Sequence, residues 1–183
     1  REQVAKDAFL ERLGLQVEYD DAHVQRAELS VIVSGVHELR MAFDLMSTDG
    51  EEAWANIDAR LAAVPETLDG YRATLLEEAG RGNVSARRQM QEMVKQVRSW
   101  TGGPDGGVFG SLVGGSNLDG ALRGRLDRHA ETASAAFDDF AAFLDTELAP
   151  RGREVEAVGR DRYALGSRYF LGATVDLEET YAW

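Results

Sequence analysis

The sequence contains no cysteine, which excludes disulfide bonds and thiolate metal sites. It also lacks any apolar run close to the roughly 20 residues that span a bilayer, and no segment is typical of a signal peptide. Because the chain begins without a methionine, a leader removed from the protein is compatible with the sequence, and a cytoplasmic location is the default expectation.

Basic residues are scarce relative to acidic ones. The chain has 20 Lys and Arg against 32 Asp and Glu, which gives a formal net charge of -12. This charge repels phosphate groups, so we expect neither nucleic acid nor an anionic membrane as a partner. Hydrophobic residues make up 44% of the 183 residues, which is enough to build a core.

Apolar residues recur every three or four positions along most of the chain, which predicts an all-α fold. The run 29–33 fits either a strand or the start of a helix. The predicted helices cover 1–13 (ended by Gly14), 36–46, 49–63, 65–80, a stretch from an Asn83 or Ser85 cap to Trp100, about 118–148, 161–171 and 175–183. Between 49–63 and 65–80, Pro65 is predicted to break the chain into two helices.

The predicted core follows these helical spacings. Its members are Trp54, Ile57, Leu61, Leu68, Tyr71, Leu75, Met90, Met93, Val94, Val97, Leu118, Leu122, Leu126, Ala130, Ala133, Phe137, Phe140, Leu144 and Leu148.

Residues 102–120 interrupt the helical pattern, because eight of these 19 residues are glycine. We predict a flexible glycine-rich loop that holds a small apolar patch at Val108, Phe109, Leu112 and Val113. The loop contains no lysine and lacks the Gly-Lys-Ser/Thr ending of a phosphate-binding loop. A lid, or a contact for another lobe, suits it better.

No complete catalytic or metal site is visible. His37-Glu38 begins the two-histidine pattern of a zinc peptidase, but Met41 stands where the second histidine belongs, and a thioether does not replace imidazole on zinc. The two other histidines have no partner at ligand spacing. Neighbouring carboxylates such as Asp138 and Asp139 point about 100° apart on a helix, which favours a solvated face over acid–base chemistry. We therefore predict no catalytic residue and no metal ligand in this chain.

The last segment is the most suggestive one. Arg160, Tyr163 and Arg168 are clustered in an otherwise acidic protein, and a guanidinium group is suited to binding a carboxylate. These three residues are the candidate substrate-cleft residues. The alternative explanation is that the arginines form ion pairs between helices.

The order of motifs resembles a bacterial family, the domain-of-unknown-function 885 family (DUF885). A Gly-x-x-x-Tyr element at Gly159–Tyr163 precedes a helix that opens at Leu177–Tyr181. Earlier stretches agree in the same order, including FDLM at 43–46, the Trp54 to Tyr71 spacing and the helix that starts at 86–89. Together these motifs cover nearly the whole chain.

The resemblance implies a large helical protein related to zinc-dependent peptidases of the gluzincin type. In that family the zinc motif and its glutamate lie in a C-terminal half, which residues 1–183 do not resemble. The chain would then be a single helical region, the N-terminal lobe of a larger enzyme, without a cofactor of its own. Its partners would be the remainder of its polypeptide and a peptide substrate.

Two other functions fit the residues equally well. One is a stand-alone helical module for binding or assembly, and the other is an inactive scaffold that keeps the peptidase fold.

Overall fold

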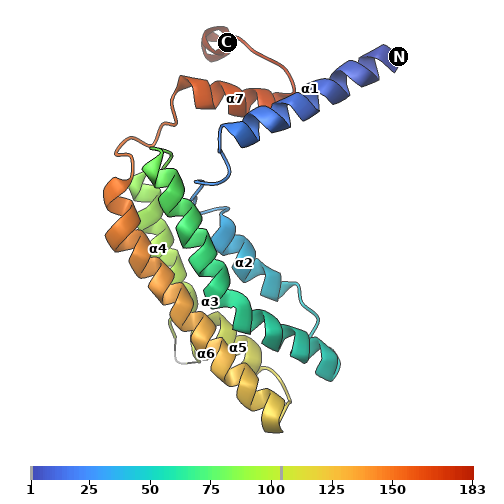
Figure 1. Ribbon diagram of the computed structural model, residues 1–183, viewed down its shortest axis with the longest axis vertical. Coiled ribbons are helices and arrows are strands. Elements are labelled where there is room, and N and C mark those ends of the chain that lie inside the picture. The colour runs from blue at the N-terminus through green and yellow to red at the C-terminus, as the bar shows by residue number, and fades with distance from the viewer. Residues whose placement is uncertain (1, 104) are drawn as a thin grey trace. The chain divides into compact units, whose positions relative to one another are not determined.

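The computed structural model describes residues 2–103 and 105–183. Within these residues it contains eight α-helices and no β-strand, which confirms the predicted all-α fold (Figure 1). The helices are α1 (Glu2–Asp21), α2 (Gly35–Asp44), α3 (Gly50–Gly80), α4 (Arg87–Thr101), α5 (Gly107–Gly114), α6 (Gly120–Phe143), α7 (Arg160–Leu171) and α8 (Leu177–Ala182). No helix in the described ranges has both the length and the apolarity needed to cross a membrane.

Contacts within the chain divide it into two compact units. The larger unit is Ala27–Glu154 and contains α2 to α6. The smaller unit combines the chain up to Arg26 with Val155–Trp183, and it contains α1, α7 and α8. That residues 1–183 act together as one lobe stays a prediction.

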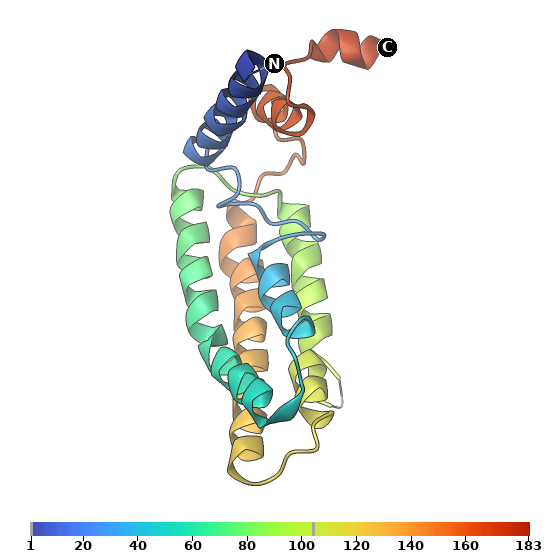
Figure 2. The same ribbon diagram turned by 90° about the vertical axis from the view of Figure 1, so that its right-hand side faces the viewer.

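The larger unit is built around three long helices that run side by side, α3, α4 and α6 (Figures 1 and 2). Helix α6 packs against α3, α4 and α5, while α2 packs on α3. Most of the predicted core is buried, as expected from one apolar stripe on each helix, while Tyr71 and Leu118 are only partly buried and pack against it. Its buried members include Trp54, Ile57, Leu61, Leu68, Leu75, Met90, Met93, Val94, Val97, Leu126, Ala133, Phe137, Phe140, Leu144 and Leu148.

A single helix, α3, replaces the two helices predicted on either side of Pro65. Proline lacks an N–H and crowds the preceding turn, which costs about 3 kcal/mol inside a helix. The helix bends but does not end (Figure 1). Leu61, Val64 and Leu68 are buried on both sides of the proline, and their burial offsets that cost.

The predicted glycine-rich loop over 102–120 contains a short helix, so the prediction of a loop is wrong for Gly107–Gly114. Phe109 and Val113 of the predicted apolar patch are 1% exposed. Burial of these two side chains outweighs the low helix propensity of glycine.

The long helix predicted over 118–148 is present as α6 and its continuation. After Phe143 the chain adds a π-helical turn at Leu144–Leu148 and a 3-10 turn at Ala149–Arg151. The helical path ends at Pro150 and Gly152, as predicted.

The start of α4 differs from the prediction. Its N-cap position is occupied by Ala86, so the predicted caps Asn83 and Ser85 are wrong. The Ser85 hydroxyl accepts a hydrogen bond from the Leu29 amide at 2.9 Å and donates one to the Ala27 carbonyl at 2.8 Å. Ser85 therefore fixes the chain at Ala27 and Leu29 instead of capping a helix.

In the smaller unit, α1 continues to Asp21, and the prediction that it ends at Gly14 is wrong. Residue 1 of the predicted helix lies outside the described residues. A glycine inside a helix costs only about 1 kcal/mol. Contacts beyond Gly14 offset it, because Leu15 is fully buried and Tyr19 stacks on Tyr169 of α7 with ring centroids 4.6 Å apart.

Tyr71 of α3 helps to seat α2. Its ring stacks on Phe140 at 5.5 Å, and a Cβ atom added to Gly35, the first residue of α2, would lie 3.1 Å from that ring. The tyrosine hydroxyl donates a hydrogen bond to the Glu28 carbonyl at 3.4 Å. Burial raises the pKa of Tyr71 to about 12, so the phenol is neutral at physiological pH.

Candidate functional site

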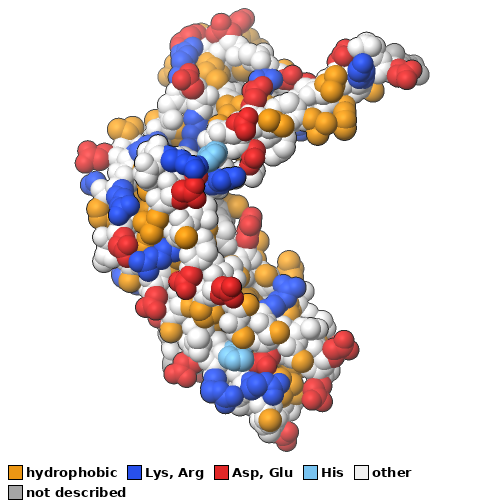
Figure 3. Space-filling model, in the orientation of Figure 1, with side chains coloured by type: hydrophobic (Ala, Val, Ile, Leu, Met, Phe, Trp, Pro, Cys, Tyr) orange, Lys and Arg blue, Asp and Glu red, His pale blue; other side chains and the backbone are white. Residues whose placement is uncertain are grey.

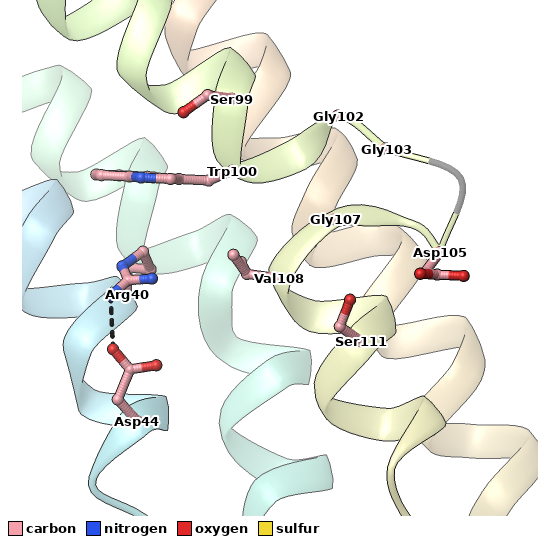
Figure 4. A pocket seen from close by; sticks show the side chains of 10 residues that line it. All are labelled: Arg40, Asp44, Ser99, Trp100, Gly102, Gly103, Asp105, Gly107, Val108 and Ser111. Carbon is pink, nitrogen blue, oxygen red and sulfur yellow. Dashed lines mark hydrogen bonds and ion pairs between the residues drawn. The ribbon is translucent and has the colours of Figure 1, made fainter.

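A hollow of about 460 Å³ opens in the larger unit between α2, the end of α4 and the start of α5 (Figure 4). A second hollow of about 280 Å³ shares Arg40, Asp44 and Val108 with it. The first hollow is lined by Arg40, Asp44, Ser99, Trp100, Gly102, Gly103, Asp105, Gly107, Val108 and Ser111. Its volume lies in the range of roughly 300–1,000 Å³ that is usual for ligand pockets.

Among the described residues that line these two hollows, Arg40 is the only basic one. Its guanidinium group pairs with the Asp44 carboxylate at 2.6 Å, one helical turn along α2. It also lies 5.4 Å from the centroid of the Trp100 ring. Arginine over an indole face is a favourable cation–π arrangement. The three side chains therefore present a donor, an acceptor and an aromatic surface in one place (Figure 4).

Two further aromatic rings pack against Trp100. The His37 ring meets it edge-on at 5.1 Å and the Phe137 ring at 6.3 Å. This packing fixes the orientation of the indole, so the hollow has a rigid wall.

His37, the start of the incomplete zinc pattern, is a structural residue. It is 7% exposed, and its Nδ1 lies 2.9 Å from the Ser34 hydroxyl while its Nε2 lies 3.1 Å from the Gln96 side-chain oxygen. Both ring nitrogens are engaged. Within residues 2–103 and 105–183, no group of three or more histidine, aspartate and glutamate side chains could hold a metal ion. The described residues therefore do not fit the zinc centre that the resemblance implies for the family.

Gly107 allows the start of α5 to lie close to the end of α4, and Gly110 allows the backbone at Asp105 to lie close to α5. Gly107 has φ +69°, and a Cβ atom there would lie 2.3 Å from the Trp100 carbonyl oxygen. A Cβ atom on Gly110 would lie 2.0 Å from the Asp105 carbonyl oxygen. Both contacts are with backbone, which does not yield as a flexible side chain does. The side of the hollow that the start of α5 forms thus depends on Gly107.

The three candidate residues predicted from sequence all lie on α7, in the smaller unit. Arg160 pairs with Glu178 at 2.5 Å, and Arg168 binds Glu11 at 2.8 Å and Glu18 at 2.7 Å. These partners raise the pKa of both arginines. The structure therefore contains the ion pairs between helices that were the alternative explanation for these arginines. That these residues, or the 61% exposed Tyr163, contact a substrate stays a prediction.

The sequence did not reveal a partly buried cluster between α3 and α6. Asp58 is 8% exposed, and its two oxygens bind His129 Nδ1 at 2.7 Å and Arg125 Nε at 2.9 Å. A pattern was present that could have identified it: Asp58 lies between Trp54 and Leu61 at core spacing, where an acid needs a partner. The cluster joins two helices and orients His129.

The paired carboxylates do not converge on one point. Asp138 accepts a hydrogen bond from the Thr101 hydroxyl at 2.5 Å. Glu178 is held by Arg160, while the Glu178 and Glu179 amides donate to Asp176 at 2.9 and 3.0 Å. These two bonds lower the pKa of Asp176.

Comparison with known sequences agrees with the resemblance drawn from the motifs. Residues 1–183 match the sequence model of a family described as bacterial protein of unknown function (DUF885). No curated protein matches the chain.

Proposed function

The chain belongs to the DUF885 family of bacterial proteins, and from this membership and the hollow beside Arg40 we propose that it is the helical, non-catalytic lobe of a zinc peptidase-like protein. In this proposal the lobe binds the peptide substrate. The metal and its catalytic glutamate are supplied by a part of the protein outside residues 1–183, as the resemblance implies.

The observation that carries the proposal is the chemistry around Arg40. A peptide group offers one carbonyl acceptor and one N–H donor. Arg40 has five N–H donors, of which one nitrogen faces Asp44, and the carboxylate of Asp44 has further acceptor capacity. The pair is thus complementary to a peptide group. Trp100 and Val108 add an apolar surface for a neighbouring side chain.

The charge of the hollow supports a peptide over a phosphorylated ligand. One arginine and two aspartates, Asp44 and Asp105, line it, so the formal charge is negative. The chain as a whole has a net charge of -12. Both charges disfavour phosphate groups and are compatible with an amide or an amino terminus.

The smaller unit supports a contact with the remainder of the polypeptide. Phe170, Leu171 and Tyr181 are 83%, 62% and 93% exposed. Exposed large apolar side chains on neighbouring elements of the sequence are compatible with an interface. In the proposal this surface of α7 and α8 packs against the part that holds the metal.

The binding role is tested by titrating the chain with a set of short unphosphorylated peptides while recording amide and indole N–H resonances. We expect the Trp100 indole and the amides of 102–111 to shift with a common dissociation constant. Arg40→Ala should weaken that binding about tenfold or more, because a hydrogen bond to a charged group contributes roughly 1.5–3 kcal/mol.

Arg60→Ala is the matched control, since Arg60 is exposed on α3 and does not line the hollow. It should bind as the parent chain does. Shifts confined to Arg160, Tyr163 and Arg168 would move the substrate contact to α7 and contradict the role of the hollow. An unchanged affinity in Arg40→Ala would contradict it as well.

A further inference from the structure

Helix α1 has one face that is used within the smaller unit. Glu11 and Glu18 bind Arg168, and Arg12 donates a hydrogen bond to the Tyr169 carbonyl at 2.7 Å. All three α1 residues lie on the same side of the helix as the buried Leu15. This side of α1 is therefore occupied by α7.

The opposite face of α1 is apolar and uncovered. Phe9, Leu10, Leu13 and Val17 are 63%, 55%, 50% and 59% exposed. With 3.6 residues per turn they fall within a strip about 100° wide, directed away from α7. Figure 3 shows hydrophobic side chains at the surface along α1. A strip of this kind on a helix is suited to pairing with another helix.

Opposite charges flank this strip symmetrically. Lys6 and Asp20 each lie seven residues, or about two turns, from Leu13, one before it and one after it. Both are exposed, and within residues 2–103 and 105–183 neither takes part in an ion pair. A two-fold axis through Leu13 would bring Lys6 of one copy to Asp20 of the other.

We infer that α1 is a self-association surface, through which two copies of this chain pair their α1 helices antiparallel about Leu13. In this arrangement Phe9 packs on Val17 of the second copy, and Leu13 packs on its own equivalent. A parallel pair would place Lys6 against Lys6 and Asp20 against Asp20, and like charges disfavour it. The charge pattern is thus self-complementary only in the antiparallel orientation.

The surface is small, so the association is reversible. Four half-exposed side chains per chain bury less than the roughly 1,200–2,000 Å² of a stable interface. We expect a dissociation constant on the order of 100 µM. Sedimentation equilibrium should show the mass rising from 20.1 kDa towards twice that value as the concentration approaches about 1 mM.

The absence of cysteine allows a direct test of the geometry. In Leu13→Cys the two new thiols lie next to the two-fold axis, so mild oxidation should give a disulfide-linked dimer in high yield. Asp7→Cys is the matched control: it is exposed on α1 but lies about 120° around the helix. It should stay largely monomeric under the same conditions. Equal cross-linking of the two variants would overturn the inference.

Charge reversal tests the orientation. Lys6→Glu and Asp20→Lys should each weaken dimerisation about fivefold or more, and the double variant should restore it, because the swapped charges pair again. Both positions are exposed, so the variants should keep the helical circular dichroism of the parent chain. The inference would be overturned if the parent chain were monomeric at 1 mM. It would also be overturned if the double variant dimerised as weakly as the single variants.

Discussion

Gly107→Ala is expected to lower the free energy of unfolding of the larger unit by about 3 kcal/mol or more. Alanine in the left-handed region costs roughly 1–2 kcal/mol by itself. In addition, its Cβ would lie 2.3 Å from the Trp100 carbonyl oxygen and 2.7 Å from that of Thr101. Helix α5 would have to separate from α4. Urea unfolding followed by tryptophan fluorescence measures the loss, since Trp54 and Trp100 both lie in the larger unit.

Gly114→Ala is the control for this variant. Gly114 is in the same helix, has no atom within 4 Å of an added Cβ, and does not have a positive φ. Alanine should be neutral there or stabilise by about 0.5–1 kcal/mol. If the two alanine variants unfolded at the same urea concentration, α5 would not be seated against α4 as described.

Phe137→Ala should have an effect of similar size, about 3–5 kcal/mol. Phe137 is fully buried, and its ring meets Phe109 at 5.3 Å and Trp100 at 6.3 Å. Truncation would leave a cavity between α4, α5 and α6, behind the wall of the hollow. Thermal and urea unfolding should both show the loss.

Phe170→Ala removes the same side chain where it is 83% exposed, and the free energy of unfolding should change by no more than about 0.5 kcal/mol. Phe137→Leu, which keeps more of the buried volume, should lie between the parent and Phe137→Ala. A Phe137→Ala variant as stable as Phe170→Ala would mean that the aromatic cluster is not the centre of the core.

The core was predictable because burial follows spacing. Met90, Met93 and Val97 could be assigned from a single stripe, and each is fully buried. The same holds for Phe137 on α6. Such assignments need no knowledge of the partner helix, since burial of an apolar stripe stabilises the fold whichever helix covers it.

Helix ends were less predictable, because local rules compete with packing. Pro65 and Gly14 both disfavour a helix, yet α3 and α1 continue through them. The local penalty is about 3 kcal/mol for proline and about 1 kcal/mol for glycine. Contacts made by residues further along, such as Leu68 and Leu15, outweigh it. A sequence alone does not give the size of those contacts.

The hollow beside Arg40 was not predicted from the sequence, for a similar reason. Arg160 and Arg168 were conspicuous in the sequence, but their ion-pair partners Glu178, Glu11 and Glu18 include residues more than a hundred positions away. Arg40 and Trp100 come together only when α2 meets the end of α4. No spacing rule connects two residues on different helices.

The central proposal, that this chain binds substrate without taking part in the chemistry, is tested most directly by peptide turnover in a longer DUF885 protein that contains this chain together with the proposed metal-bearing part. In that protein Arg40→Ala should raise KM about tenfold and leave kcat within about twofold, because it removes binding shared by the ground and transition states. Arg60→Ala should change neither constant. A tenfold fall in kcat at unchanged KM, or no change in either constant, would contradict the account.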